Sequence, residues 1–339
     1  NAANTTQTVQ QLVTIFIVIA GAFEFSLGNI TTGAIIACVM LSGRTVAPLT
    51  QIATTLARMR QAKLSLSILN TIMKQEEDRP SSTGFVNRIV NSGDFVFQDV
   101  SFQYPNSDHK VLDKISFSVR AGERVGIIGK IGSGKTTMGR LLAGLYHSST
   151  GRILVNGVDV KQYHPAEIRQ AVSYAGQSVD LFNGTLKENL LIADPEATDE
   201  EIVAAAAKTG VDDFAKQHPR GYDLIVGERG TSLSGGQQQS VAITRLLLGN
   251  PKIVFLDEPS GALDMATERE LIGNLANAFG RETTLVISTH RYSLLNLVDR
   301  LIVLDRGKIV ADGPKDKVLE AMTERAKAAQ NGVSSASNE

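Results

Sequence analysis

One short segment of the chain has the residue types and spacing of a phosphate-binding loop, G-x-x-x-x-G-K-[ST]. It comprises Gly129, Lys130, Ile131, Gly132, Ser133, Gly134, Lys135 and Thr136. The apolar residues VGII precede it and an amphipathic helix is expected after it, so backbone N–H groups and the helix N-terminus can surround phosphate oxygens. We expect Lys135 to contact the β- and γ-phosphates and the Thr136 hydroxyl to bind Mg²⁺. A simple glycine turn is the less favoured interpretation.

Two acidic residues follow an apolar run later in the chain. Residues 253–256 read IVFL, and Asp257 and Glu258 come next. The carboxyl ends of parallel strands form the ligand-binding edge of an α/β sheet. There we expect Asp257 to hold Mg²⁺ through water and Glu258 to polarise the water that attacks the γ-phosphate in line. Alone, such a pair is more often a solvated strand end, but the phosphate-binding loop favours the catalytic interpretation.

The pentapeptide LSGGQ lies between these two motifs. It consists of Leu233, Ser234, Gly235, Gly236 and Gln237. A helix is expected to begin here and continue to Leu248, so exposed glycine N–H groups at its N-terminus can bind a phosphate. An isolated S-G-G is also a common loop, and the pentapeptide therefore gains weight only from the motifs around it.

The elements that must position these motifs predict an α/β fold. Short apolar runs at 125–128, 253–256 and 284–288 are typical of strands in a parallel sheet covered by helices on both faces. Turn signals at 156–157 and 305–307 predict hairpins that add antiparallel strands.

The N-terminal part has a different character. Residues 12–27 form an apolar run with one acid, Glu24, and a second apolar stretch, 33–56, follows a short break. We expect an all-α transmembrane hairpin, because the second stretch can cross a hydrocarbon core about 30 Å thick at about 1.5 Å per residue. Arg44 and Pro48 indicate that this stretch needs partner helices. A buried helix of a soluble protein is the alternative, and the lack of a basic start disfavours a secretory signal.

The domain organisation follows from these shifts in composition. Leu64, Ile68 and Ile72 recur at helical spacing, which predicts that the second stretch continues into water as a helix. Charged residues with Pro, Ser and Gly then indicate a linker. We expect a partial transmembrane domain at 1–75, a linker at 76–93, an α/β domain at 94–325 and a flexible tail at 326–339. Because the sequence opens without a methionine, we expect a fragment of a longer protein.

Composition disfavours several classes of protein. The 34 Lys and Arg residues balance 35 Asp and Glu, so no nucleic-acid partner is expected. Cys38 is the single cysteine, which excludes an internal disulfide, and the five histidines are too scattered for structural zinc. With 42% hydrophobic residues the chain can bury a core.

The order of the motifs resembles the nucleotide-binding domain of ATP-binding cassette (ABC) proteins over residues 94–319. The resemblance implies ATP and Mg²⁺ as cofactors, adenine stacking on Tyr104, and contact of Gln177 with Mg²⁺ and the attacking water. It also implies that Asp264 reports across a dimer interface and that His290 contacts the γ-phosphate. Taken alone, Tyr104 could be a core aromatic residue, Gln177 a loop amide and His290 a core histidine, each without a role at the nucleotide. The implied nucleotide contacts are Tyr104, residues 129–136, Thr137, Ser234, Gly235, Gly236, Gln237 and Asp264, and the implied catalytic residues are Glu258, His290, Gln177 and Lys135.

The resemblance also implies partners. In ABC proteins the LSGGQ of one subunit closes on the phosphate loop of another, which implies a homodimer with ATP sandwiched between subunits. Residues 227–230 (GERG) resemble the exporter-type segment that contacts membrane helices, and the hairpin resembles the last two of six spans. Two stretches, 33–49 and 289–314, look most like bacterial type I secretion ATPase-permeases. That similarity implies the bacterial inner membrane, a cytoplasmic nucleotide-binding domain, a periplasmic adaptor, an outer-membrane channel and an exported polypeptide.

Two positions depart from the family pattern. Gln238 stands where a basic residue is usual, and Gly261 where a small hydroxyl residue is usual. Their effect is open, as is the identity of the partner subunit. The expected function is ATP-driven export of a polypeptide, with lipid, drug or short peptide as alternative cargo. A soluble nucleic-acid-dependent ATPase is disfavoured by the apolar hairpin, and a non-catalytic module by Glu258 and His290.

Overall fold

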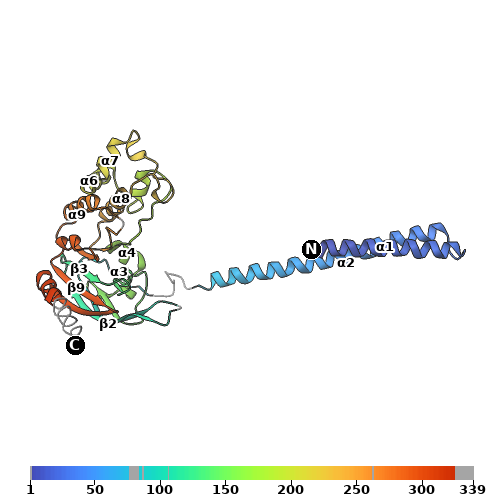
Figure 1. Ribbon diagram of the computed structural model, residues 1–339, viewed down its shortest axis with the longest axis horizontal. Coiled ribbons are helices and arrows are strands. Elements are labelled where there is room, and N and C mark those ends of the chain that lie inside the picture. The colour runs from blue at the N-terminus through green and yellow to red at the C-terminus, as the bar shows by residue number, and fades with distance from the viewer. Residues whose placement is uncertain (1, 76–83, 86–87, 106, 262, 325–339) are drawn as a thin grey trace, which may run out of the picture. The chain divides into compact units, whose positions relative to one another are not determined.

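The computed structural model describes residues 2–75, 84–85, 88–105, 107–261 and 263–324. The chain forms two compact units, Asn1–Pro80 and Ser81–Glu339 (Figure 1). The predicted tail at 326–339 and residues 76–83 of the predicted linker lie outside the described residues. Later in that linker Val90 is buried, and the Gly93 carbonyl accepts a hydrogen bond from the Thr284 hydroxyl at 2.8 Å. Both residues are therefore part of the second unit.

The first unit is a helical hairpin, as expected. Its helices are α1 (Ala2–Ser26) and α2 (Thr32–Met73), which lie side by side (Figure 1). The connection turns at Gly28, whose φ of 78° is a conformation that glycine adopts without strain. The Thr31 side chain caps α2 by accepting a hydrogen bond from a backbone amide. Gly21 permits close packing, because a Cβ there would lie 3.0 Å from the Ile35 side chain.

The apolar character of the hairpin is uneven. Residues Thr8–Ser26 of α1 are long and apolar enough to cross a membrane, and none of that window is buried within the chain. The second predicted span, 33–56, is helical throughout, but its apolar part is the shorter segment Thr32–Thr45. Arg44 and Pro48 explain the difference, since a charged residue and a proline both oppose a simple lipid-facing span. Among the described residues, α1 is thus the one helix that is both long enough and apolar enough to cross a membrane.

The second unit contains two β-sheets. The smaller sheet is antiparallel with the strand order β2-β1-β4-β5, and the larger has the order β10-β9-β3-β8-β7-β6. In the larger sheet β10 pairs antiparallel with β9, while the other neighbours pair in parallel. The strands are β1 (Phe95–Gln103), β2 (Lys110–Val119), β3 (Arg124–Gly129), β4 (Thr150–Val155), β5 (Val158–Asp159), β6 (Val172–Ala175), β7 (Ile253–Asp257), β8 (Thr284–Ser288), β9 (Arg300–Asp305) and β10 (Lys308–Pro314).

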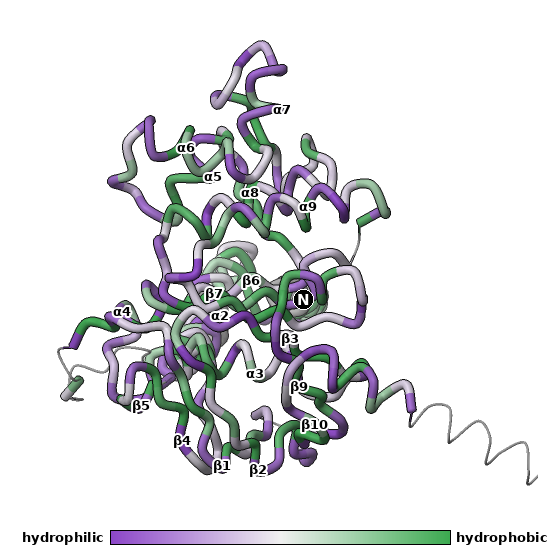
Figure 2. The backbone as a smooth tube through the Cα atoms, turned by 90° about the vertical axis from the view of Figure 1, so that its left-hand side faces the viewer, coloured by the Kyte–Doolittle hydropathy of each residue, from purple (hydrophilic) through white to green (hydrophobic). Residues whose placement is uncertain are grey.

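Helices cover the larger sheet and build a separate helical region. Figure 2 shows α5 to α9 at one end of this unit and the smaller sheet at the other. The helices are α3 (Lys135–Leu142), α4 (Pro165–Ala171), α5 (Leu186–Leu191), α6 (Asp199–Thr209), α7 (Val211–Gln217), α8 (Gly235–Leu248) and α9 (Met265–Ala278). One core joins both sheets and α3, a second packs α9 on the larger sheet, and a third fills the helical region.

The strand and hairpin predictions for this unit are confirmed. The runs at 125–128, 253–256 and 284–288 form β3, β7 and β8, which are almost entirely buried. The two predicted hairpins join β4 to β5 and β9 to β10, with left-handed turn residues Asn156, Gly157, Arg306 and Gly307. Because β3, β6, β7 and β8 run parallel, their carboxyl ends share one edge of the sheet, where the predicted motifs follow.

Candidate active site

The phosphate-binding loop connects β3 to α3. Gly134 has a φ of 109°, and a Cβ at Gly129 would lie 2.2 Å from the Leu304 carbonyl oxygen, so this path requires glycine. The Lys135 ammonium group, 6% exposed, donates to the Gly129 carbonyl at 2.9 Å and to the Lys130 carbonyl at 3.3 Å. The Ser133 hydroxyl is buried and has no hydrogen-bond partner in the described part of the chain. A buried polar group without a partner is costly, and a bound phosphate would satisfy it.

Glu258 lies next to two other predicted catalytic residues, Lys135 and His290. One carboxylate oxygen lies 3.7 Å from Lys135 Nζ and the other lies 3.1 Å from His290 Nδ1. The Glu258 side chain is 15% exposed, whereas that of His290 is 52% exposed. The structure therefore brings together residues that follow β3, β7 and β8, as expected for one sheet edge.

Asp257, the residue before Glu258, lies in a closed environment. It is 2% exposed, and the Ser288 hydroxyl donates a hydrogen bond to its Oδ1. The Tyr174 hydroxyl lies 3.1 Å from its Oδ2. Burial, together with the charge of Asp257, raises the pKa of Tyr174 to about 12. Both carboxylate oxygens of Asp257 are thus held by hydroxyl groups.

Tyr104 lies in an aromatic cluster next to α3. Its ring makes edge contacts with Phe102 and Tyr146 at centroid distances of 4.8 Å and 5.2 Å. Its hydroxyl lies 3.1 Å from the Thr137 hydroxyl, and Arg140 Nη1 donates to it at 3.4 Å. The predicted base-stacking tyrosine is thus next to the helix that carries the predicted phosphate contacts.

The loop between β7 and α9 is held by residues that the sequence analysis did not single out. Arg291, directly after His290, donates to the carbonyl of Leu263 at 3.2 Å and to that of Gly261 at 3.4 Å. It also pairs with Glu268. A Cβ at Gly261 would lie 3.4 Å from the nearest atom, the Glu258 carbonyl, which is an ordinary contact. The glycine there is therefore not required by space.

Asp264 and Gln177 occupy separate positions around this loop. Asp264 caps α9, since its Oδ1 accepts hydrogen bonds from the amides of Ala266 and Thr267 at 2.9 and 3.0 Å. These backbone bonds, with one from the Thr267 hydroxyl, lower the pKa of Asp264. The Gln177 amide nitrogen lies near Gly261, 3.8 Å from where a Cβ would be.

The LSGGQ segment forms the N-terminus of α8, as predicted. The Ser234 side chain accepts from the Gln237 amide, and the Gln237 side chain accepts from the Ser234 amide at 2.9 Å, which is a capping box. Gln238 donates to the carbonyls of Gly230 and Leu233 at 2.9 and 3.1 Å. The residue that departs from the family pattern thus secures the segment that precedes α8.

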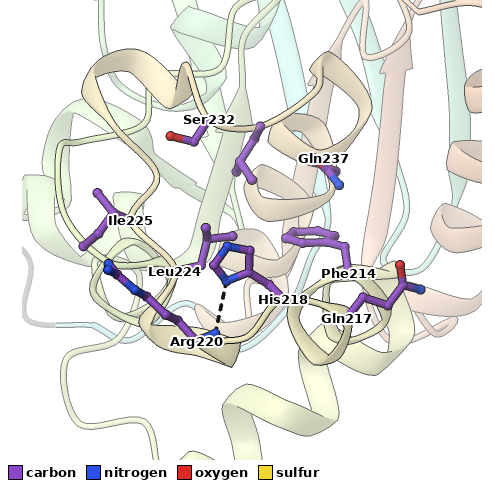
Figure 3. Close-up of a pocket in the computed structure, with 9 residues that line it drawn as sticks. Phe214, Gln217, His218, Arg220, Leu224, Ile225, Ser232 and Gln237 are labelled. Atoms are coloured by element: carbon purple, nitrogen blue, oxygen red, sulfur yellow. Dashed lines mark hydrogen bonds between the residues drawn. The ribbon is translucent and has the colours of Figure 1, made fainter.

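The LSGGQ residues line pockets that differ from the one at the phosphate loop. Figure 3 shows Ser232 and Gln237 on one side of a cavity of about 590 Å³, with Phe214 and His218 on the other. A second cavity of about 290 Å³ contains Ser234, Gly236 and Gln237 with α9 residues. The cavity at the phosphate loop, about 790 Å³, contains Gly129, Lys130 and His290 instead. The LSGGQ residues and the phosphate-loop residues thus line different cavities.

The donor set suits a magnesium-bound nucleotide. Thr136, Asp257 and Gln177 offer hydroxyl, carboxylate and amide oxygens, which are the ligands that Mg²⁺ prefers. Within the described residues no group of three or more His, Cys, Asp or Glu side chains could hold a metal alone. Mg²⁺ is usually bound by one or two carboxylates together with substrate phosphates, so this composition fits a metal that arrives with nucleotide.

Comparison with known families identifies the domain. The sequence profile of the ABC transporter family matches residues 112–261. These residues belong to the ABC transporter family. ATPase activity is accordingly the chemistry expected of this ABC domain.

Several relatives extend the similarity beyond the ABC domain. The chain is 36% identical to the ATP-dependent lipid A-core flippase of Aromatoleum aromaticum (strain DSM 19018 / LMG 30748 / EbN1). It is 34% identical to the alpha-hemolysin translocation ATP-binding protein HlyB of Escherichia coli. These alignments cover 91% and 92% of this chain but 50% and 44% of the relatives. The chain therefore spans about half the length of the curated relatives it matches.

A solved structure shows the same fold. The structure of a bacterial Atm1-family ABC exporter with ATP bound matches with a TM-score of 0.73 and 30% sequence identity. The match covers 94% of this chain and 56% of that one. The resemblance to exporter-type ABC proteins is thus shown for the hairpin together with the ABC domain.

Four residues that contact the predicted site were not predicted from the sequence. Tyr174 and Ser288 bind Asp257, and Arg291 with Glu268 holds the loop before α9. Tyr174 lies three residues before Gln177, and Arg291 lies next to His290, so proximity to a motif was the available signal. Their partners lie 83 and 23 residues away in the sequence, and no local pattern indicates those pairings.

Proposed function

We propose that this chain is the ATPase-bearing part of a bacterial ABC exporter that couples ATP hydrolysis to the export of a polypeptide. The observation that carries the ATPase assignment is the position of Glu258 between Lys135 and His290. A carboxylate in this position can accept a proton from water, while the two neighbouring groups can contact the γ-phosphate.

Each proposed site residue has one task. Lys135 and the loop residues bind the phosphates, Tyr104 stacks on adenine, and Glu258 takes the proton of the attacking water. Thr136, Asp257 and Gln177 would hold Mg²⁺, which when bound neutralises charge on the phosphates. His290 would orient the γ-phosphate. It lies next to one carboxylate oxygen of Glu258, and Lys135 lies next to the other.

The proposed working form is a homodimer. Ser234 and Gly236 would bind the ATP held by the partner's phosphate loop, and Asp264 would lie at the dimer interface. This arrangement is supported by the separate pockets that contain the two motifs in one chain. ATP binding would close the dimer and hydrolysis would release it, a two-state motion that can act on attached helices.

The proposed location is the bacterial inner membrane, with the ABC domain in the cytoplasm. The apolar window Thr8–Ser26 supports membrane insertion. A periplasmic adaptor and an outer-membrane channel are the further partners proposed for a type I secretion system. Relatives named as translocation ATP-binding proteins, for alpha-hemolysin and for toxin RTX-I of Actinobacillus pleuropneumoniae, support a polypeptide cargo.

A lipid cargo is the second candidate. The lipid A-core flippase has 36% identity, slightly above the 34% of the hemolysin translocation protein. Two identities this similar do not separate the two cargo classes, so a direct assay must do so.

The deciding experiment compares cells that carry the natural gene with cells that carry Glu258→Gln in the same gene. We expect quantitative proteomics to find specific polypeptides lost from the culture medium and retained in the cells. Glu200→Gln, which changes an exposed carboxylate on α6, is the matched control. An unchanged medium with glycolipid retained in the inner leaflet would replace the polypeptide proposal with lipid export. No change in either would overturn the exporter proposal.

A further inference from the structure

Tyr174 reaches Asp257 from the neighbouring strand. Tyr174 lies on β6 and pairs in register with Phe255 of β7, two residues before Asp257. Its hydroxyl lies 3.1 Å from Asp257 Oδ2. Ser288, on β8, donates a hydrogen bond from its hydroxyl to the other carboxylate oxygen. Asp257 is therefore oriented from both flanking strands.

The chemistry of the carboxylate fixes the direction of the hydrogen bond at Asp257. An ionised carboxylate can only accept, so the Tyr174 hydroxyl donates its O–H to Asp257 Oδ2. Arg140 of α3 donates to the Tyr104 hydroxyl at 3.4 Å, and its positive charge opposes the rise in the pKa of Tyr174.

The fold reserves space for this ring. A Cβ at Gly139 of α3 would lie 2.7 Å from the Tyr174 ring and 2.6 Å from the Phe255 ring. Any residue larger than glycine would have to displace those rings. The helix that carries Lys135 and Thr136 therefore packs directly over Tyr174.

We propose that Tyr174 is a positioning residue for the metal-bound nucleotide, which holds the Asp257 carboxylate in the orientation that Mg²⁺ requires. Tyr174 does not touch the nucleotide itself. Groups that hydrogen-bond to a metal-binding carboxylate fix its orientation, and their removal commonly weakens metal binding about 10- to 100-fold. This inference rests on the proposed role of Asp257 at Mg²⁺.

The test is Tyr174→Phe in the whole chain, purified in detergent. The variant keeps the ring that fills the space beside Gly139 and removes only the hydroxyl. ATP affinity is measured by displacement of a fluorescent nucleotide, once with excess Mg²⁺ and once with EDTA. We expect affinity in Mg²⁺ to fall about tenfold or more and affinity in EDTA to stay within about twofold. The Mg²⁺ concentration for half-maximal hydrolysis should rise in parallel.

Tyr222→Phe is the matched control. The Tyr222 hydroxyl is bonded to a carboxylate oxygen of Asp212 at 3.0 Å, so the chemistry removed is the same, but the pair lies in the helical region. Both ATP affinities of this control should equal those of the natural chain. Thermal unfolding of the nucleotide-free proteins provides a second comparison of the two variants.

The possible outcomes separate the inference from the function beneath it. An unchanged Mg²⁺ dependence in Tyr174→Phe would overturn the positioning role. Equal loss of affinity with and without Mg²⁺ would also overturn it, because a general structural defect acts on both. If the natural chain itself bound ATP and hydrolysed it without any dependence on Mg²⁺, the proposed role of Asp257 would fail first.

Discussion

At the scale of single residues, Glu258 shows how strand ends become a site. Its φ of 50° lies in the left-handed region, which costs a non-glycine residue roughly 1–2 kcal/mol. Its amide donates to the Ser288 carbonyl at 2.8 Å, which secures this conformation at the end of β7. The turn directs the carboxylate toward Lys135 and His290. The strained backbone conformation thus places one carboxylate next to the Lys135 ammonium group and the His290 ring.

Replacement of Glu258 by Gln should separate nucleotide binding from hydrolysis. The amide keeps the shape of the side chain but cannot accept the proton of water, so the hydrolysis rate should fall at least about 100-fold. ATP affinity should be retained, because Lys135 and the loop amides remain. The measurements are phosphate release and nucleotide binding on the purified chain, and size-exclusion chromatography should show an ATP-bound dimer that persists.

The exposed carboxylate of Glu200 supplies the control for this substitution. Glu200→Gln should hydrolyse ATP at the natural rate. Near-natural hydrolysis in Glu258→Gln would remove Glu258 from the role of base.

At the scale of elements, the N-terminus of α9 depends on a buried ion pair. The Glu268 side chain is 8% exposed and accepts hydrogen bonds from Arg291 and Ser293. Burial alone would raise the pKa of Glu268, but the hydrogen bonds from Ser293 and Arg291 outweigh it and lower the pKa. Arg291 in turn holds the carbonyls of Gly261 and Leu263. One carboxylate thus secures the loop between Glu258 and Asp264.

This arrangement predicts a pH dependence of stability. The folded-state pKa of Glu268 lies below its ordinary value of 4.5, so its contribution is present above that value and is lost as pH falls through the folded pKa. Glu268→Gln should reduce the free energy of unfolding by about 2 kcal/mol near pH 7. The difference from the natural chain should shrink as pH falls below 4.5 and through the lower folded-state pKa of Glu268. Denaturant unfolding followed by circular dichroism at several pH values measures it.

Glu320, which is exposed, provides a comparison for the same measurement. Glu320→Gln should leave the free energy of unfolding almost unchanged at every pH. A gap for Glu268→Gln that stays constant from neutral to acidic pH would show that its ionisation does not stabilise the fold.

At the scale of the whole molecule, the two phosphate-binding motifs of one chain line different cavities. Gly129 and Lys130 line one cavity, whereas Ser234 and Gly236 line another. A site assembled between two chains would complete itself by symmetry, since each chain supplies both halves. The proposed homodimer therefore makes a specific prediction about mixed subunits.

Two inactive variants should restore activity when they are mixed. Lys135→Ala disables the phosphate loop and Ser234→Arg disables LSGGQ, so each variant alone should be inactive. A mixed dimer contains one site in which both motifs are natural. Random mixing gives such dimers half of the time, so ATPase activity should recover to at most about a quarter of the natural value. Phosphate release from the separate and mixed proteins measures the recovery.

A mixture of Lys135→Ala with Glu258→Gln is the comparison for this experiment. Both changes affect residues of the same half-site. Each site of this mixed dimer therefore lacks either the natural Lys135 or the natural Glu258. That mixture should stay inactive. Failure of the first mixture to recover any activity, with mixed dimers demonstrated, would contradict a site shared between chains.

The amino-acid sequence alone determined the parts of this protein that depend on local patterns. The apolar runs at 125–128, 253–256 and 284–288 predicted β3, β7 and β8 because continuous burial leaves a direct trace in residue type. Gly129, Gly134 and Lys135 predicted the phosphate loop because residues at this spacing form, within one short segment, the loop that binds phosphate. The helical hairpin followed from two apolar stretches around one break.

Only the tertiary structure decided which side chains meet. Tyr174 and Asp257 are 83 residues apart in the sequence, and Ser288 bonds to the same carboxylate from a third strand. Arg291 and Glu268 are paired across the ends of β8 and α9. Such contacts depend on strand order and register, which arise when separate strands and helices pack into one core. A hydrogen bond between distant residues has no local spacing rule, so the sequence contains its two partners but does not indicate their pairing.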